Sequence, residues 1–204
     1  VKVKDYEDPN LLLRDLQLGK TQLSYTGPLT YVMLSEIVVL YPLATASYGD
    51  FPHTNTAIIT LVEQPWNSLD ELIDQAEQIR FSLSGYSSLT GYLIPMMEFT
   101  ERDAVKNPRE HQFKQLTIST KHETTARGIL QQVFDAGAVD RRTLEYMIDA
   151  GYIDGQAIKT IWTSPNIYSY TLAAAETLDR ETVGYVRRAI LGLKQADHEF
   201  YNQL

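Results

Sequence analysis

The chain has 204 residues, a formal net charge of −8 and an isoelectric point near 5.0. Binding to nucleic acids or to anionic membranes requires clustered Lys and Arg, so this acidic balance argues against both partners. The sequence contains no Cys, which excludes disulfides, zinc–thiolate sites and a Cys nucleophile, and no apolar run approaches the roughly 18 residues of a membrane-spanning helix.

The first part of the chain is predicted to alternate between strands and helices. Asp8 is a suitable helix cap and Pro9 fits the first helical position, so a helix is expected from there to Gly19. Apolar runs predict a short helix at residues 29–34 and strands at residues 1–3, 22–25, 38–46 and 56–62. The resulting order, β-α-β-α-β-β, favours an α/β sheet.

The alternation restarts at Ser68, which forms a capping box with Glu71 at the start of a helix over residues 68–78. The rest of the chain is predicted to contain helices at 90–99, 122–136, 142–150 and 179–193, strands at 79–82, 115–119, 137–139, 160–163 and 170–174, and a surface loop at 107–114. The expected buried side of helix 122–136 carries Ile129, Leu130, Val133 and Phe134. Because no flexible linker precedes the restart, the pattern predicts two α/β lobes joined by strands.

The stretch "SGYSSLTGYLIP", residues 84–95, places small hydroxyl residues and glycines between a predicted strand and a predicted helix. The first N–H groups of a helix have no partner within it, and the helix dipole adds partial positive charge there. The hydroxyls of Ser88 and Thr90 can donate beside them, so this turn can hold phosphate, phosphonate, sulfate or carboxylate. Most turns of this composition are only helix caps, which is the alternative interpretation of these residues.

Three common catalytic and phosphate-binding motifs do not fit this sequence. It has neither the nucleophile elbow G-x-S-x-G nor a glycine-rich phosphate loop, and the zinc-protease motif begun by His122-Glu123 has Ala126 where a second His is required. We therefore expect no metal and no cofactor. His122 follows the predicted strand 115–119, at a strand end where open α/β sheets bind ligands, although a residue that starts a helix can also simply face solvent. An enzyme would need a general base, for which only His122 is a candidate.

Four stretches, by their order and spacing, resemble the periplasmic binding proteins for phosphonate, phosphite and phosphate, which are the solute receptors of ABC importers. They are "DYEDPNLLLRDLQLGKTQLSYTGPLTYV", "SSLTGYLIP", "KHETTARGILQQVFDAGAVD" and "IWTSPNI". The resemblance implies the type II periplasmic-binding fold, with two lobes that are each a sheet flanked by helices and a ligand cleft between them. Residues 1–61 and 165–204 would form lobe one, without the family's usual first strand, and residues 62–164 would form lobe two.

The resemblance also implies which residues bind the ligand. Tyr6 matches a family tyrosine that donates to the oxyanion, and His122 matches a histidine in the family's ligand cleft. Asp140 follows the strand whose side chain, in the family, contacts the substituent of the ligand. A helix start, Ser-Thr-Ser-Gly in the family, matches residues 88–91 here. The full set of implied ligand-binding residues is Tyr6, Thr54, Ser88, Leu89, Thr90, Gly91, His122 and Asp140.

Some positions depart from the family pattern. Leu89 replaces a hydroxyl residue but keeps its backbone N–H, and Thr54 or Asn55 lies where a cleft tyrosine is expected. Members that bind aminoalkylphosphonates carry acidic residues for the amine, and the comparable positions here are Arg142 and Tyr170. We therefore expect a ligand with an uncharged substituent.

The expected function is that of a non-enzymatic solute-binding protein that holds a small phosphorus oxyanion and delivers it to an ABC transporter permease. The alternative is a sensing domain of the same fold fused to a membrane receptor. The expected location is periplasmic or otherwise extracytoplasmic, with or without membrane association. The expected state is a monomer.

Overall fold

The computed structural model describes residues 2–6, 8–45 and 53–196. The chain divides into two compact units, a terminal unit (Val1–Pro52 and Tyr168–Leu204) and a central unit (His53–Ile167). It therefore passes twice from one unit to the other. From the sequence, we expect the chain to cross between the units after residues 61 and 164. In the structure, strand β4 (Thr56–Leu61) already belongs to the central unit, because both strands that pair with it lie there.

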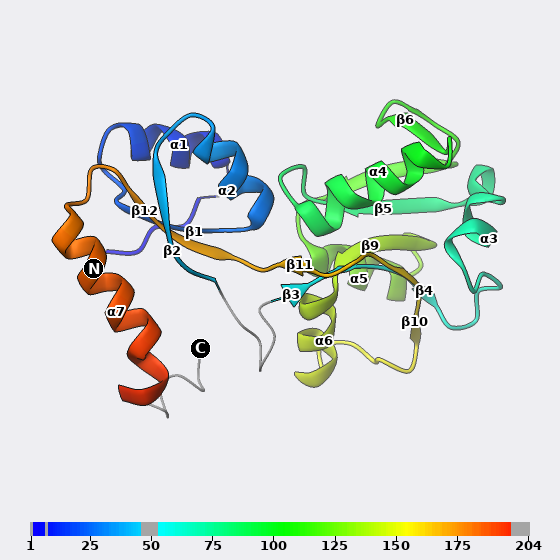
Figure 1. The fold of residues 1–204 in the computed structure, drawn as a ribbon. Helices are drawn as coiled ribbons and strands as arrows, with labels where there is room; N and C mark the ends of the chain where they lie inside the picture. Colours follow the sequence, from blue (N-terminus) through cyan, green and yellow to red (C-terminus); the bar gives the residue numbers. More distant parts are fainter. Residues whose placement is uncertain (1, 7, 46–52, 197–204) are drawn as a thin grey trace. The chain divides into compact units, whose positions relative to one another are not determined.

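The terminal unit is built on a three-stranded sheet (Figure 1). Its central strand, β12 (Thr171–Ala175), pairs antiparallel with β1 (Leu23–Thr26) and with β2 (Leu40–Thr45). The amphipathic helix α1 (Pro9–Gln17) and the mostly apolar helix α2 (Pro28–Ser35) provide leucines that pack with the alanines of β12. The long helix α7 (Arg180–Ala196) packs against β2.

The central unit contains a five-stranded mixed sheet in the order β10-β4-β9-β5-β8. Strands β9 (Ala136–Asp140) and β8 (Gln115–Ser119) flank β5 (Arg80–Ser84), and both are parallel to it. Strands β4 and β10 (Ile158–Thr163) run antiparallel on the other side. Because three neighbouring strands are parallel, their carboxyl ends meet at one edge of the sheet.

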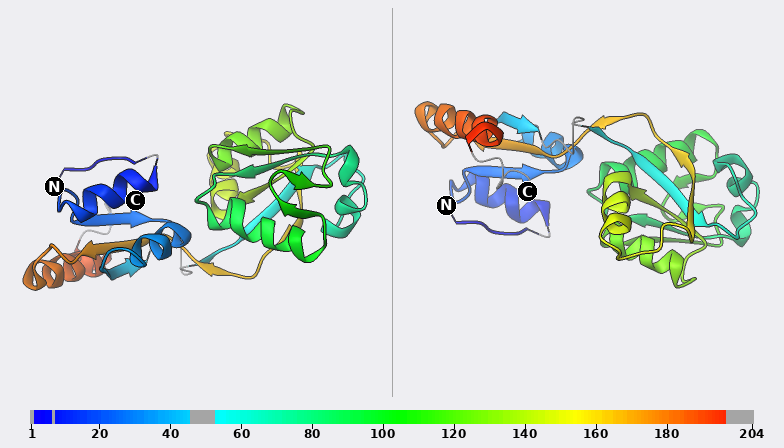
Figure 2. Two further views of the ribbon diagram at one scale, coloured as in Figure 1. Left: turned by 90° about the horizontal axis from the view of Figure 1, so that it is seen from above. Right: turned by 90° about the horizontal axis from the view of Figure 1, so that it is seen from below.

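Helices cover both faces of this central sheet (Figures 1 and 2). On one face, Ile58 and Phe81 pack with residues of α3 (Leu69–Ile73) and α4 (Ile94–Glu101). On the other, Ile59 and Val139 pack with residues of α5 (His122–Leu130) and α6 (Arg141–Asp149). Alternate strand residues thus enter two separate cores, which explains why these strands are apolar on both sides.

The predicted helix signals act as expected. Asp8 caps α1 by accepting the backbone N–H of Asn10 at 2.8 Å. Ser68 caps α3 by accepting the N–H of Glu71 at 3.2 Å. After α6, Gly151 adopts φ of 70°, the left-handed conformation that ends a helix without a Cβ penalty.

Two predicted elements are shorter or absent. Residues 2–3 of the predicted strand 1–3 are not in a strand, since an extended segment forms one only where another strand pairs with it, and Val1 lies outside the described residues. Helix α5 ends at Leu130 rather than at residue 136, because Gln132 adopts φ of 57° and the N–H of Val133 returns to Gly128 O. Val133 is consequently 51% exposed, so its predicted burial is wrong.

Short elements that the sequence did not predict complete the central unit. Helix 68–78 is interrupted, with the turn η1 (Ala76–Gln78) following α3. The predicted loop 107–114 contains part of a hairpin, β6 (Val105–Asn107) and β7 (Glu110–His111). Strand β3 (His53–Thr54) pairs with β11 (Ile167–Tyr168), where the chain enters and leaves the unit.

Candidate functional site

The candidate site lies where β5, β8 and β9 end in the central unit. Ser84 and Ser119, the last residues of β5 and β8, are direct neighbours in the ladder. Asp140 ends β9 and faces Thr56, the first residue of β4. Each of the three parallel strands is followed by a helix, so helix N-termini gather at this edge, which is the end of an α/β sheet where ligands bind.

The turn after β5 has a backbone shaped by glycine. Gly85 adopts φ of 61°, and the π-helical turn η2 (Leu89–Leu93) follows, with the N–H of Leu93 bonding Ser88 O at 3.1 Å. π-helical turns occur often at functional sites. A Cβ on Gly91 would lie 2.5 Å from Ser84 O and 2.7 Å from the His122 ring, so only glycine lets the turn approach both.

The Ser88 hydroxyl is placed to donate a hydrogen bond. Its Oγ accepts the backbone N–H of Gly91 at 2.9 Å and lies 3.3 Å from His122 Nε2. A hydroxyl has two acceptor lone pairs and one proton. When His122 donates from Nε2, both lone pairs of Ser88 are used, and its proton is left for Thr90 Oγ1, which lies 3.5 Å away, or for a ligand oxygen.

His122 is held as that donor by its second nitrogen. Its Nδ1 accepts the backbone N–H of Asp140 at 3.0 Å, which places the proton of the neutral ring on Nε2. Burial lowers the pKa of His122, and the charges of Asp140 and Glu123 oppose that shift without reversing it. The ring is thus a neutral Nε2–H donor near neutral pH.

Two backbone N–H groups at this turn are also available. Among the described residues, the N–H groups of Leu89 and Thr90 have no hydrogen-bond partner, as expected for the first turn of a helix. The first turn of α5 has no side-chain cap either. In contrast, Asp140 Oδ1 caps α6 by accepting the N–H of Thr143 at 3.1 Å. The free donors are therefore those of η2 and α5.

The structure brings most of the predicted residues together. Ser88, Leu89, Thr90 and Gly91 form the start of η2, and His122 starts α5 beside Ser88. Asp140 contacts His122 through its backbone, and its Oδ2 accepts the hydroxyl of Thr54 at 2.8 Å. Arg141 and Arg142, which follow Asp140 directly, pair with Glu145 and not with Asp140.

Tyr6 lies in the terminal unit and its hydroxyl is engaged there. The hydroxyl donates to Asp15 Oδ2 at 2.8 Å, and its oxygen lies 2.7 Å from Thr21 Oγ1. Lys4 also bonds Asp15 Oδ2, at 2.7 Å, and lies over the Tyr6 ring. A ligand-binding role of Tyr6 stays a prediction, and it requires the hydroxyl to exchange one of these contacts for the ligand.

Buried hydroxyls beneath the site were missed by the sequence reasoning. Thr125 Oγ1, on the first turns of α5, lies 2.8 Å from Ser84 Oγ and 2.6 Å from Ser119 Oγ. Thr56 donates to the carbonyl of Thr90 at 2.8 Å. Small hydroxyl residues at alternate positions of an apolar strand, as at Ser82 and Ser84, are the signal that could have revealed them.

Taken together, the geometry can hold a small oxyanion. The donors are the hydroxyl of Ser88, which the Nε2–H of His122 holds, the neighbouring hydroxyl of Thr90 and the N–H groups of Leu89 and Thr90, all of them neutral. No group of three or more His, Asp or Glu that could hold a metal ion occurs within the described ranges. In the same part of the chain, none of the helices is both long and apolar enough for a membrane span.

The whole chain, residues 1–204, matches the profile of the family described as "ABC transporter, phosphonate, periplasmic substrate-binding protein". A binding-protein component of a phosphonate ABC transporter from Pseudomonas aeruginosa is similar in structure, with a TM-score of 0.76, 19% identity and coverage of 92% of this chain and 61% of that one. The PhnD1 protein from Prochlorococcus marinus, in complex with methylphosphonate, has a TM-score of 0.69 and 16% identity over 86% of this chain and 64% of its own.

A histidine kinase sensor domain with similarity to periplasmic binding proteins also matches, with a TM-score of 0.57 and 14% identity over 93% of this chain and 71% of its own. At these identities the likeness shows the fold, which is that of the type II periplasmic binding proteins, as predicted. The chain spans 61% of the length of the Pseudomonas aeruginosa protein.

Proposed function

Because the chain belongs to the family of periplasmic phosphonate-binding proteins of ABC transporters, we propose that it binds a small phosphorus oxyanion at the start of η2 and delivers it to a transporter permease. One observation carries the proposal. Ser88 accepts from Gly91 and from His122, so its hydroxyl proton is available to a ligand oxygen beside the free N–H groups of Leu89 and Thr90, in place of the 3.5 Å contact with Thr90 Oγ1. A phosphonate, phosphite or phosphate oxygen is such an acceptor.

Binding rather than chemistry is the proposed activity. Hydrolysis would need a base beside the anion, and His122 is committed on both nitrogens, as an acceptor from Asp140 and as a donor to Ser88 or the ligand. We expect the protein to act as a monomer outside the cytoplasm, as family membership implies for its location.

The sensing domain of a membrane receptor is the second candidate. It draws on the likeness to the histidine kinase sensor domain, which concerns the fold. Both roles begin with oxyanion binding at the same residues, so binding is the step to test first.

The test is a thermal-shift and calorimetric comparison of phosphate, phosphite, methylphosphonate, 2-aminoethylphosphonate and sulfate. Binding by at least one phosphorus oxyanion, with its ³¹P NMR signal unchanged over hours, supports the proposal. Turnover of the ligand would instead indicate an enzyme. A stabilising effect of sulfate alone would reject phosphorus selectivity.

A further inference from the structure

Asp140 connects the candidate site to the segment by which the chain enters the central unit. Its backbone N–H holds His122 Nδ1 at 3.0 Å, while its carboxylate Oδ2 accepts the hydroxyl of Thr54 at 2.8 Å. Thr54 belongs to β3, one residue after the unit boundary at Pro52 and His53. A single residue thus contacts both the ligand-facing histidine and the crossing strand.

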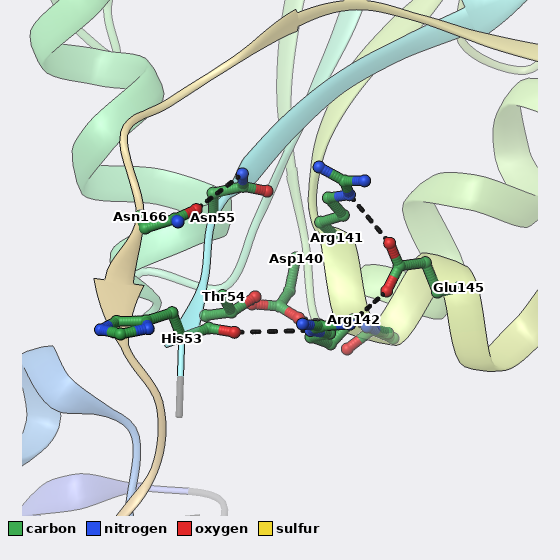
Figure 3. Close-up of polar contacts among 9 residues, drawn as sticks. His53, Thr54, Asn55, Asp140, Arg141, Arg142, Glu145 and Asn166 are labelled. Carbon is green, nitrogen blue, oxygen red and sulfur yellow. Dashed lines mark hydrogen bonds and ion pairs between the residues drawn. The ribbon is translucent and has the colours of Figure 1, made fainter. Parts of the chain in front are cut away.

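A second contact reaches the same strand from the helix that Asp140 caps. The Nε of Arg142 lies 3.4 Å from the His53 carbonyl and its Nη1 pairs with Glu145 Oε2 at 2.9 Å (Figure 3). Arg141 pairs with the other oxygen of Glu145, at 2.8 Å, but among the described residues its side chain forms no hydrogen bond with β3. Neighbouring arginines therefore share one partner and differ in the contact with the crossing strand.

The entering and leaving segments are also joined. The side-chain amide of Asn55 donates to Asn166 Oδ1 at 3.4 Å, and Asn166 immediately precedes β11, the pairing partner of β3. The backbone carbonyl of Asn55 accepts the N–H of Arg141, the first residue of α6, at 3.0 Å. Both segments are thereby tied to the start of α6.

We propose that Asp140 is a positioning residue that relays occupancy of the oxyanion site to β3, with Thr54 as its receiving contact and Arg142 as a support. An anion that accepts the Ser88 proton fixes the hydroxyl to which His122 Nε2–H donates, the His122 ring in turn holds the Asp140 N–H, and the Asp140 carboxylate holds Thr54. Motion between units in proteins of this architecture is absorbed by a few residues where the chain crosses, so such a contact couples binding to the crossing. This proposal rests on the proposed function in one respect: the ligand whose binding is relayed is taken to be an oxyanion.

The ligand-free protein provides the first test, by hydrogen exchange of the amides at 53–55 and by ¹⁵N NMR of the His122 ring. Thr54→Val removes a hydrogen bond to a charged group, so exchange at 53–55 is expected to become about tenfold faster. The ¹⁵N NMR signals of the His122 ring should no longer show the Nε2–H tautomer alone. Thr54→Ser should restore both, which a general packing defect would not allow.

Matched controls separate the relay from ordinary loss of stability. Thr60→Val removes another buried hydroxyl of the central sheet, which lies on β4 and donates to Asp135 O at 2.7 Å. It should change neither the exchange at 53–55 nor the NMR signal of the His122 ring. Arg142→Gln should speed exchange at 53–55, whereas Arg141→Gln should not. Unchanged exchange in Thr54→Val, or an equal change in Thr60→Val, overturns the relay.

The second test adds methylphosphonate or phosphate. The relay predicts slower exchange at 53–55 in the wild-type protein and no such slowing in Thr54→Val. If calorimetry shows anion binding but exchange at 53–55 does not respond, the relay is wrong and the proposed function stands. If no anion binds, the proposed function fails. The exchange rates at 53–55 in the ligand-free variants then decide whether Asp140 and Thr54 are coupled.

Discussion

The Nδ1 atom of His122 accepts the backbone N–H of Asp140 at 3.0 Å. This bond fixes the tautomer of the ring, because the nitrogen that accepts cannot also carry a proton. The other nitrogen, Nε2, then faces Ser88 as a donor. Protonating His122 would place two donors against each other at Nδ1, so the site offers an anion a neutral donor and not a cation.

Stability should depend on pH through His122. Burial lowers its pKa in the folded protein below the ordinary value of about 6.5. As pH falls through 6.5, the unfolded chain binds a proton before the folded protein does, so the free energy of unfolding decreases toward acid pH. Urea unfolding between pH 7.5 and pH 5 should show this decrease, and His122→Gln should reduce its slope. An identical slope in the variant would contradict the assignment.

Replacing Ser88 and Thr90 together by Ala should weaken anion binding at least about tenfold. Each hydrogen bond to a charged group is worth roughly 1.5–3 kcal/mol, and a factor of ten is about 1.4 kcal/mol. Ser88 also accepts the N–H of Gly91, so part of the loss comes from a less ordered turn. Titration calorimetry measures the effect, and equal affinity in the double variant and the wild type would remove these hydroxyls from the site.

Gly91→Ala should abolish binding while the fold is retained at reduced stability. Its Cβ would lie 2.5 Å from Ser84 O and 2.7 Å from His122 Cε1, so the turn or the ring must move. Gly192→Ala is the control, because its Cβ meets no atom within 4 Å and Ala favours the helix α7. Wild-type affinity in Gly91→Ala would show that the close approach of η2 and His122 is not needed.

Ligands with an uncharged substituent should bind better than 2-aminoethylphosphonate, by at least about 1.4 kcal/mol or tenfold. A buried ammonium needs an unpaired carboxylate, and both oxygens of Asp140 already accept bonds, from Thr54 and from Thr143. Glu145 is occupied by Arg141 and Arg142. Competition binding that ranks 2-aminoethylphosphonate first would show that another acid receives the amine.

Local signals in the sequence predicted much of the fold. Capping residues such as Asp8 and Ser68 and the glycine after α6 identify helix ends, because their chemistry acts within a few residues. The early end of α5 could not be predicted, since it depends on the left-handed conformation of Gln132, a residue with no special tendency to adopt it. The hairpin β6–β7 was missed because its residues are polar and mostly exposed.

The candidate site was predictable only in part. The Ser/Thr/Gly turn and His122 stood out by residue type, and their positions after strands explain why they meet. The link from Asp140 to Thr54 joins residues 86 positions apart, so it follows from the pairing of β4 with β9 and not from any local pattern. The same holds for Thr125, whose hydroxyl contacts Ser84 and Ser119 from another element.

Calorimetric titration of the wild-type protein with phosphite, phosphate and methylphosphonate tests the central claim most directly. The account predicts saturable binding of at least one of them, with a single site per chain that is weakened in the Ser88/Thr90 double variant. Absence of heat and of any thermal shift with all three, in a protein shown to be folded by circular dichroism, would contradict it.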